Sequence, residues 1–190
     1  GRVGHTGTLD PLATGVLVVC VGKATKLVNM LTCEHKTYIA EVTLGIKTDT
    51  YDITGNILKE EIPNATDEDI ISVVNSFKVE YEQEVPIYSA DKINGKKLYE
   101  YARNNIEVEL PKRLVCIDDI KIISDIKREN NRIIFSIETS VSKGTYIRSL
   151  VNDIALKLNT IGVMSSLRRT KLGDISIDLC KNIDELKLSD

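Results

Sequence analysis

The sequence predicts an α+β fold built on a mixed, largely antiparallel sheet that is flanked by helices. Apolar and polar residues alternate over residues 35–46, which is typical of a half-buried strand. Two further strand-like stretches, 114–123 and 132–141, are separated by the polar turn Lys127–Asn131, which indicates a hairpin. Over 145–158, apolar residues at spacings of three and four indicate a helix that packs one stripe against the sheet.

The first third of the chain predicts three more elements. The short apolar run 16–21 is rich in β-branched residues and predicts a strand buried on both faces. Residues 23–31 are consistent with a short helix. Thr66, with Asp69 three residues later, resembles a capping box and marks the start of a helix that runs through Phe77.

The remaining elements are an insertion and two short terminal pieces. A strand-like piece, a break at Pro86 and a short helix indicate an insertion outside the core, at about 79–110. We expect a last strand over 173–177 and a helical turn over 183–188. No internal repeat or linker divides the chain, so we expect a single domain over 1–190.

Composition excludes several classes of protein. The 190 residues, 42% of them hydrophobic, can close one core. No apolar stretch approaches the roughly 20 residues of a membrane span, and no secretory signal is visible, so we expect a cytoplasmic protein. Two histidines and four widely spaced cysteines argue against a metal site and for free thiols. The cysteines are Cys20, Cys33, Cys116 and Cys180.

Charge is distributed unevenly along the chain. The net charge of −3 by itself argues against a nucleic-acid partner. However, residues 143–171 carry six Lys and Arg side chains against Asp153 alone, whereas 49–84 carry ten acidic side chains against two lysines. The basic stretch would attract RNA phosphates in a salt-dependent way, and the acidic stretch would exclude them.

One aspartate stands in an unusual glycine-rich run, Gly-His-Thr-Gly-Thr-Leu-Asp-Pro-Leu-Ala-Thr-Gly, at residues 4–15. Pro11 disfavours the helical region for Asp10 and pushes it towards an extended conformation. The glycines allow sharp bends and the close approach of a partner. The run alone leaves two interpretations open: a carboxylate displayed for chemistry, or an ordinary Asp-Pro turn.

Four further stretches decide between these interpretations. They are Lys36-Thr37-Tyr38 leading into Leu44-Gly45 and Thr48-Asp49-Thr50-Tyr51-Asp52, the segment Tyr88–Arg103, Lys143-Gly144-Thr145-Tyr146-Ile147-Arg148, and Leu167-Arg168-Arg169-Thr170. Together with 4–15, and in the same order, these stretches resemble motifs of the TruB-type tRNA pseudouridine synthases of bacteria. The resemblance implies the pseudouridine synthase fold, with the insertion as an RNA-gripping thumb. It also implies that an N-terminal segment and a C-terminal RNA-binding domain of the family are absent from 1–190.

The resemblance implies three catalytic residues: Asp10, Arg148 and Tyr38. Asp10 would be the catalytic aspartate, and the guanidinium of Arg148 would keep it ionised beneath a bound base. Tyr38 would stack on the uracil. Without the resemblance, Arg148 would be interpreted as a solvated arginine at the rim of its helix, and Tyr38 as a core tyrosine.

The resemblance also implies a set of substrate contacts, with neither cofactor nor metal. His5 would fill the space left by a flipped nucleotide. Asp52, Tyr146 and Leu167 match positions that line or brace the site. The expected RNA contacts are Lys92, Arg103, Lys143 and Arg168.

The implied function is the isomerisation of uridine to pseudouridine at position 55, in the T arm of tRNA, by a monomer. The base would be flipped out, and its glycosidic bond broken and re-formed with the help of Asp10. Two alternatives stay open: a non-catalytic, tRNA-binding folding helper, and the catalytic subunit of a guide-RNA-directed pseudouridylation particle. We expect the chain to be less active than one with the missing N-terminal segment.

Overall fold

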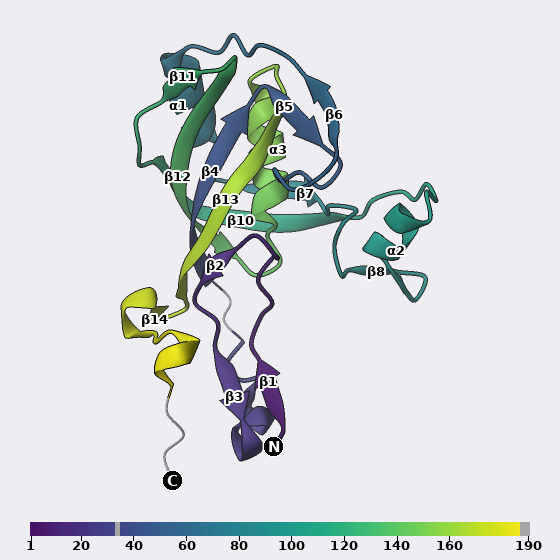
Figure 1. Ribbon diagram of the computed structural model, residues 1–190, viewed down its shortest axis with the longest axis vertical. Coiled ribbons are helices and arrows are strands. Elements are labelled where there is room, and N and C mark those ends of the chain that lie inside the picture. Colours follow the sequence, from purple (N-terminus) through teal and green to yellow (C-terminus); the bar gives the residue numbers. More distant parts are fainter. Residues whose placement is uncertain (33–34, 187–190) are drawn as a thin grey trace.

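A curved, eight-stranded sheet forms the body of the protein in the computed structural model, which describes residues 1–32 and 35–186 (Figure 1). Its main path runs β14-β13-β4-β12-β10-β7, with β11 paired to β12 and β2 paired to β13. All these pairings are antiparallel except β2 with β13. The strands are β2 (Thr14–Gly15), β4 (His35–Leu44), β7 (Glu80–Glu84), β10 (Lys112–Ile122), β11 (Lys127–Glu129), β12 (Arg132–Ser142), β13 (Gly162–Leu172) and β14 (Ile175–Ser176).

Strand β4 lies at the centre and confirms the alternation expected over 35–46. Ala40, Val42 and Leu44 are fully buried on one face, and Val42 pairs with Phe135 of β12. The predicted hairpin is confirmed by the pairing of β10 with β12, although β11 extends the turn between them. Hydrophobic periodicity was sufficient here because one face of each strand is covered.

Two helices cover that face. Helix α3 (Ile147–Lys157) buries Leu150, Val151 and Ile154, each burial contributing roughly 1.5–3 kcal/mol. Helix α1 (Asp67–Ser76) begins at Thr66 with the expected capping box and adds Ile70 and Val74 to the same core. Both helices lie behind the sheet in Figure 1. The predicted α+β class is therefore confirmed.

The expected doubly buried strand over 16–21 is wrong. Only β3 (Val19–Val21) is a strand; it pairs with β1 (Val3–His5), and the side chains of Val19 and Val21 are exposed. This ribbon projects away from the sheet (Figure 1). The 3₁₀ helix η1 (Gly22–Leu27) follows it, where a longer helix was expected over 23–31. Apolar β-branched residues suit an exposed ribbon as well as a buried strand, so composition misled the prediction.

Strand β13 was not predicted, although it pairs along β4 and borders the core. Two β-bulges interrupt it, between Met164 and Ser166 and between Arg169 and Lys171. A bulge adds one residue to a strand and so breaks the two-residue period on which the prediction depends. Polar residues between the bulges hid the pattern further.

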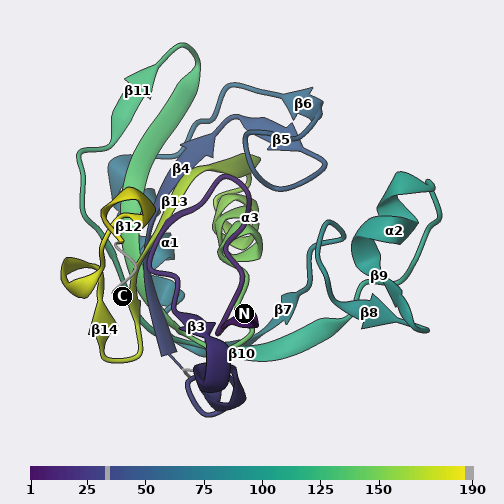
Figure 2. The same ribbon diagram turned by 60° about the horizontal axis from the view of Figure 1, so that its bottom comes forward.

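The insertion begins later than expected. Residues 80–84 form β7, which pairs with β10 at the edge of the main sheet, so 79–84 belong to the body. The projecting part is the segment 85–111, called the arm below; the backbone amide of Val85 bonds the carbonyl of Pro111 at its base, at 2.9 Å. The arm carries β8 (Lys92–Ile93), β9 (Lys96–Lys97) and α2 (Leu98–Arg103), and it extends from one side of the body (Figure 2).

Smaller elements complete the fold. Strands β5 (Ile46–Thr48) and β6 (Ile57–Glu60) form a hairpin, and β14 confirms the expected last strand. Two 3₁₀ helices, η2 (Ile177–Leu179) and η3 (Ile183–Glu185), end the described chain; residues 187 and 188 of the expected helical turn lie outside it. Cys20, Cys116 and Cys180 are free thiols, whereas Cys33 lies outside the described residues. No described helix is long and apolar enough to cross a membrane.

Candidate active site

Asp10 lies in a loop, residues 7–16, that is closed at its neck by the backbone. The amide of Thr6 bonds the carbonyl of Val18 at 3.2 Å, and the amide of Ala13 bonds the carbonyl of Asp10 at 2.9 Å within the loop. Gly15 has φ +110°, and a Cβ there would lie 2.1 Å from the carbonyl oxygen of Arg169. Only glycine therefore allows the loop to run so close to β13.

The Asp10 carboxylate faces Arg148, which is the second residue of α3. Arg148 Nε donates to Asp10 Oδ2 at 2.9 Å, and Nη2 lies 3.5 Å from Oδ1. The side chain of Arg148 is 5% exposed and that of Asp10 is 31% exposed. Arg148 is therefore not a solvated arginine at the rim of its helix, and the ion pair has one buried and one accessible member.

The same guanidinium joins two other segments. Arg148 Nη1 donates to the carbonyl of Thr50, and Nη2 donates to the carbonyl of Tyr88 at the base of the arm, each at 3.0 Å. A buried charge is tolerated when its donors are satisfied. Arg148 thus fixes the Asp10 loop, the loop after β5 and the arm around one point.

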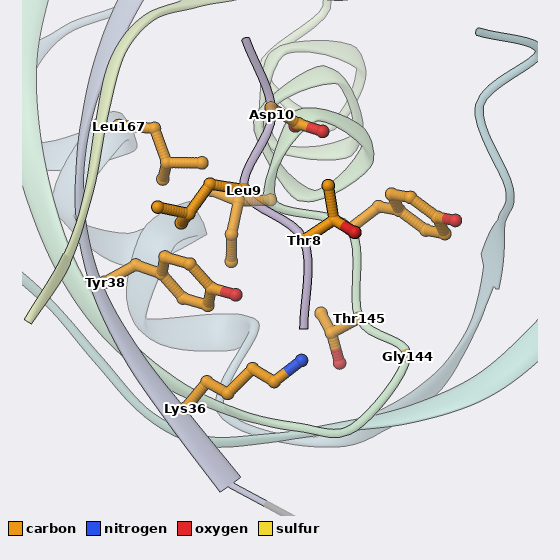
Figure 3. Close-up of a pocket in the computed structure, with 10 residues that line it drawn as sticks. Thr8, Leu9, Asp10, Lys36, Tyr38, Gly144, Thr145 and Leu167 are labelled. Carbon is orange, nitrogen blue, oxygen red and sulfur yellow. The ribbon is translucent and has the colours of Figure 1, made fainter. Parts of the chain in front are cut away.

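A cavity of about 190 Å³ opens beside Asp10 (Figure 3). The labelled side chains of Tyr38, Leu9 and Leu167 form an apolar side, and Lys36 and Thr145 lie at another side. A cavity of about 150 Å³ accepts a benzene ring, so this one has room for a single six-membered base. Its lining is Thr8, Leu9, Asp10, Lys36, Tyr38, Gly144, Thr145, Tyr146, Ile147 and Leu167.

Two tyrosines of the cavity have perturbed hydroxyl groups. Burial raises the pKa of Tyr38 above its usual value, and the charge and hydrogen bonding of Arg169 partly offset that rise. Burial also raises the pKa of Tyr146, and the Asp91 carboxylate adds to the shift. Both hydroxyls therefore stay protonated at neutral pH. Arg148 lies 6.0 Å from the centre of the Tyr146 ring.

Asp52 does not line the cavity. Its carboxylate accepts hydrogen bonds from Thr54 (backbone N at 2.9 Å, Oγ1 at 2.5 Å) and from Thr50 Oγ1 at 3.1 Å. These bonds shape a turn in which Tyr51 has φ +65°, an unusual value for a residue with a large side chain. Asp52 thus acts on the site indirectly, by holding the segment whose Thr50 carbonyl binds Arg148.

Five predicted RNA contacts lie outside the cavity. His5 is an exposed residue of β1, opposite Val19. Lys92 and Arg103 are exposed on the arm, where Arg103 lies 5.0 Å from the centre of the Tyr99 ring. Lys143 and Arg168 are exposed on the body, and Arg168 donates to Thr14 Oγ1 at 3.2 Å. The cavity therefore brings together Asp10, Tyr38, Tyr146 and Leu167 with Arg148 beside them, but not these five.

The prediction from the sequence missed Arg169 and Gln83. Arg169 is fully buried beside the Asp10 loop, and Gln83, 2% exposed, accepts a hydrogen bond from the backbone amide of Tyr146 at 2.8 Å. Because Arg148 and Arg169 are both buried, they add nothing to the basic surface expected over 143–171. The motif around 167–170 was a usable signal for Arg169, but the exposed Arg168 was chosen.

Comparison with known proteins identifies the family. The family described as "TruB family pseudouridylate synthase (N terminal domain)" matches residues 1–147. The chain belongs to the TruB family. Among relatives in the TruB family, tRNA pseudouridine synthase B of Bacillus subtilis (strain 168) is 50% identical over 188 residues, and that of Clostridium tetani (strain Massachusetts / E88) is 45% identical over 186 residues. These alignments cover 98% and 97% of this chain, and 61% and 63% of the relatives.

Solved structures share this fold. The Cbf5-Nop10-Gar1 complex contains a chain that superposes with a TM-score of 0.63 at 28% identity, over 92% of this chain and 42% of that one. A chain of an H/ACA RNP bound to a substrate RNA containing 2′-deoxyuridine gives a TM-score of 0.60 at 27% identity, over 93% and 40%. The chain spans about three fifths of the length of the curated relatives that it matches.

Proposed function

We propose that this TruB family chain isomerises uridine to pseudouridine in tRNA. One observation carries the proposal: an accessible carboxylate, Asp10, is paired with a buried guanidinium, Arg148, at the side of a cavity with room for one base. The names of the relatives, all tRNA pseudouridine synthase B, support the same substrate class.

The reaction needs no group from outside the substrate and the protein. The bond between N1 of uracil and C1′ of ribose breaks, the base turns, and a bond forms between C5 and C1′. The proton on C5 is lost, and N1 gains one. A carboxylate beside the ribose can stabilise or capture the electron-poor centre, as in glycosidases. Arg148 holds the Asp10 carboxylate in place beside the cavity for this step.

The cavity can hold the base while the bond is broken. Tyr38 offers an aromatic face, and Leu9 and Leu167 offer an apolar surface, which suits a base removed from its stack. His5, exposed on the neighbouring β1, would fill the space that the nucleotide leaves in the RNA. The basic residues Lys92, Arg103, Lys143 and Arg168 would bind phosphates around the cavity.

We further propose that the substrate is the uridine at position 55 in the T arm, and that the chain acts as a monomer. The alternative of a guide-RNA-directed subunit is supported by the fold of the complexes above, at 27–28% identity. The bacterial tRNA enzymes are 45–50% identical and favour a protein that needs no guide RNA. The folding-helper alternative would keep RNA binding without chemistry.

Release of tritium from a T-arm stem-loop carrying [5-³H]uridine only at position 55 tests the proposal. We expect release by the wild type without any partner, and a loss of more than about 10³-fold in Asp10→Asn. Asp174→Asn, a change at an exposed aspartate of the turn before β14, should behave as the wild type. Release by Asp10→Asn would exclude Asp10 as the catalytic group. A wild type that binds the stem-loop but releases no tritium would support the folding helper.

A further inference from the structure

Arg169 is a buried arginine to which the proposed chemistry gives no role. It lies on β13 and is 0% exposed. Within residues 1–32 and 35–186, no carboxylate lies within ion-pair distance of its guanidinium; its partners are backbone carbonyls and the Tyr38 hydroxyl. A buried charge without a counter-ion is costly, so a fold that keeps one has a specific use for the donors.

Those donors reach both ends of the Asp10 loop. Nε donates to the carbonyl of Val16 at 2.9 Å, and Nη2 donates to the carbonyl of Gly7 at 3.1 Å. The backbone carbonyl of Arg169 also accepts from the amide of Val16 at 2.8 Å. Gly7 and Val16 are the first and last residues of the loop, so a single side chain spans its neck.

We propose that Arg169 is a positioning residue that clamps the Asp10 loop and thereby holds the Asp10 carboxylate against Arg148. The catalytic part of this proposal rests on the proposed function; the clamp itself does not. The two arginines then have different roles: Arg148 binds the carboxylate, and Arg169 binds the backbone on either side of it.

The planar fork of arginine is essential to this geometry. Its Nε and Nη2 groups point in different directions and reach two carbonyls at once, whereas the single ammonium of lysine is a compact point donor. Arg169→Lys keeps the charge but loses the two-ended clamp. If Arg169 served only as a buried charge, Arg169→Lys would behave as the wild type.

Hydrogen exchange of backbone amides, followed by mass spectrometry, tests the clamp without any assay of activity. We expect peptides that cover 7–16 to exchange about ten-fold faster in Arg169→Lys and Arg169→Met, while peptides of α1 and β12 keep the wild-type rate. Arg128→Met is the matched control, because Arg128 also bonds a backbone carbonyl, that of Ala65, but at the start of α1. Unchanged exchange over 7–16 in Arg169→Lys, or equally fast exchange everywhere, would overturn the clamp.

Kinetics then test the positioning role. In Arg169→Lys we expect kcat for the stem-loop to fall about 100-fold, the loss typical of a catalytic group misplaced by about 1 Å, with KM nearly unchanged. A purely structural role would reduce the amount of active protein and leave kcat per folded molecule intact. That result, with folded protein counted by active-site titration, would contradict positioning. A wild type without activity would instead contradict the proposed function, and the exchange experiment would still stand.

Discussion

The position of the Asp10 carboxylate depends on the hydrogen bonds that hold Arg148 in place. Each of three segments, the Asp10 loop, Thr50 and Tyr88, receives a hydrogen bond from this one guanidinium. The charge is therefore held at a fixed distance from the carboxylate, although Asp10 itself remains accessible. Exposed ion pairs contribute little because their members move and are screened, whereas this pair has one immobile member.

Arg148→Lys tests this geometry at the level of one residue. An ammonium group can pair with Asp10 but cannot also serve both carbonyls, so the carboxylate should shift and kcat should fall about 100-fold. The loss of donors to two carbonyls should lower the free energy of unfolding by about 1–3 kcal/mol. Single-turnover kinetics and urea titration measure the two effects. Wild-type kcat in this variant would show that a positive charge alone suffices.

A second prediction at this scale concerns Gly15. Gly15→Ala should lower the free energy of unfolding by about 3 kcal/mol or more, because the new Cβ would overlap the backbone of Arg169 in addition to the strain of a positive φ. Gly22→Ala is the matched control: Gly22 has φ +61° and open space around a Cβ, so only about 1–2 kcal/mol of strain is expected. If urea unfolding showed the same loss of unfolding free energy for Gly15→Ala and Gly22→Ala, the close approach of Gly15 to β13 would be unimportant.

At the scale of elements, β7 is hydrogen-bonded to α3 through Gln83, Tyr81 and the backbone carbonyl of Glu84, which accepts from Ser149 Oγ at 2.8 Å. Gln83 accepts from the Tyr146 amide at the start of the helix, and its Nε2 donates to the Tyr81 hydroxyl at 2.9 Å. That hydroxyl donates to Asp153 Oδ2 on the same helix, also at 2.9 Å. This chain of hydrogen bonds sets where α3 begins and hence where Arg148 lies. An edge strand of the sheet thus helps to position the site.

Asp153 makes this contact dependent on pH. Burial, with a smaller contribution from Glu84, raises the pKa of Asp153 to about 6, above its ordinary value of 3.8. The folded state then binds the proton more tightly than the unfolded state. The protonated carboxyl group therefore contributes to the free energy of unfolding at low pH, and this contribution is lost as pH rises from about 4 to about 6. The Asp153→Asn variant has no titratable carboxyl group at this position and so does not lose this contribution. Relative to wild type, it should gain about 1–2 kcal/mol between pH 4 and pH 8, after allowance for partial exposure.

Urea unfolding at several pH values measures this gain. Asp174→Asn, at an exposed residue of the turn before β14, is the control variant. A pH-independent difference for Asp153→Asn would mean that the Asp153 carboxyl group is not perturbed by its place between α3 and β7.

At the scale of the whole molecule, the arm is attached directly to the site. Arg113 bonds Asp91 of the arm at 2.8 Å and the carbonyl of Gly144 at 3.3 Å, and Arg148 bonds the carbonyl of Tyr88. Gly144 lines the cavity. RNA held by the arm would therefore be held in a set position relative to Asp10, even though the arm projects from the body (Figure 2).

The basic surface of the arm gives a prediction on salt dependence. Replacing Lys92, Lys96 and Arg103 by Gln should weaken stem-loop binding and reduce the slope of log affinity against log salt by about 2–3, since each phosphate contact contributes about 0.7–0.9. Lys121, Lys127 and Arg128, on β10 and β11 away from the arm, provide the control triple. Equal slopes for the arm variant and the wild type would show that the arm does not bind phosphates.

Much of the fold was predictable because regular periods reveal which face is covered. Strand β4 and helix α3 follow such a period and were placed from it, whereas helix α1 was placed from its capping box. Strand β13 was missed because its two bulges arise from pairing with β4 and leave no regular period. The exposed β1–β3 ribbon was misassigned because its apolar composition is compatible with both a buried and an exposed strand.

For the site, the sequence by itself determined the glycine-rich run that carries Asp10 and, through its motifs, the family. Only the tertiary structure decided that Asp10 meets Arg148, 138 residues away, and that Arg169 is buried against the Asp10 loop whereas Arg168 is exposed. The physical reason is that local preferences act over a few residues. In contrast, the side of a strand on which a residue lies depends on its register, and in β13 that register is shifted by bulges that form only against β4.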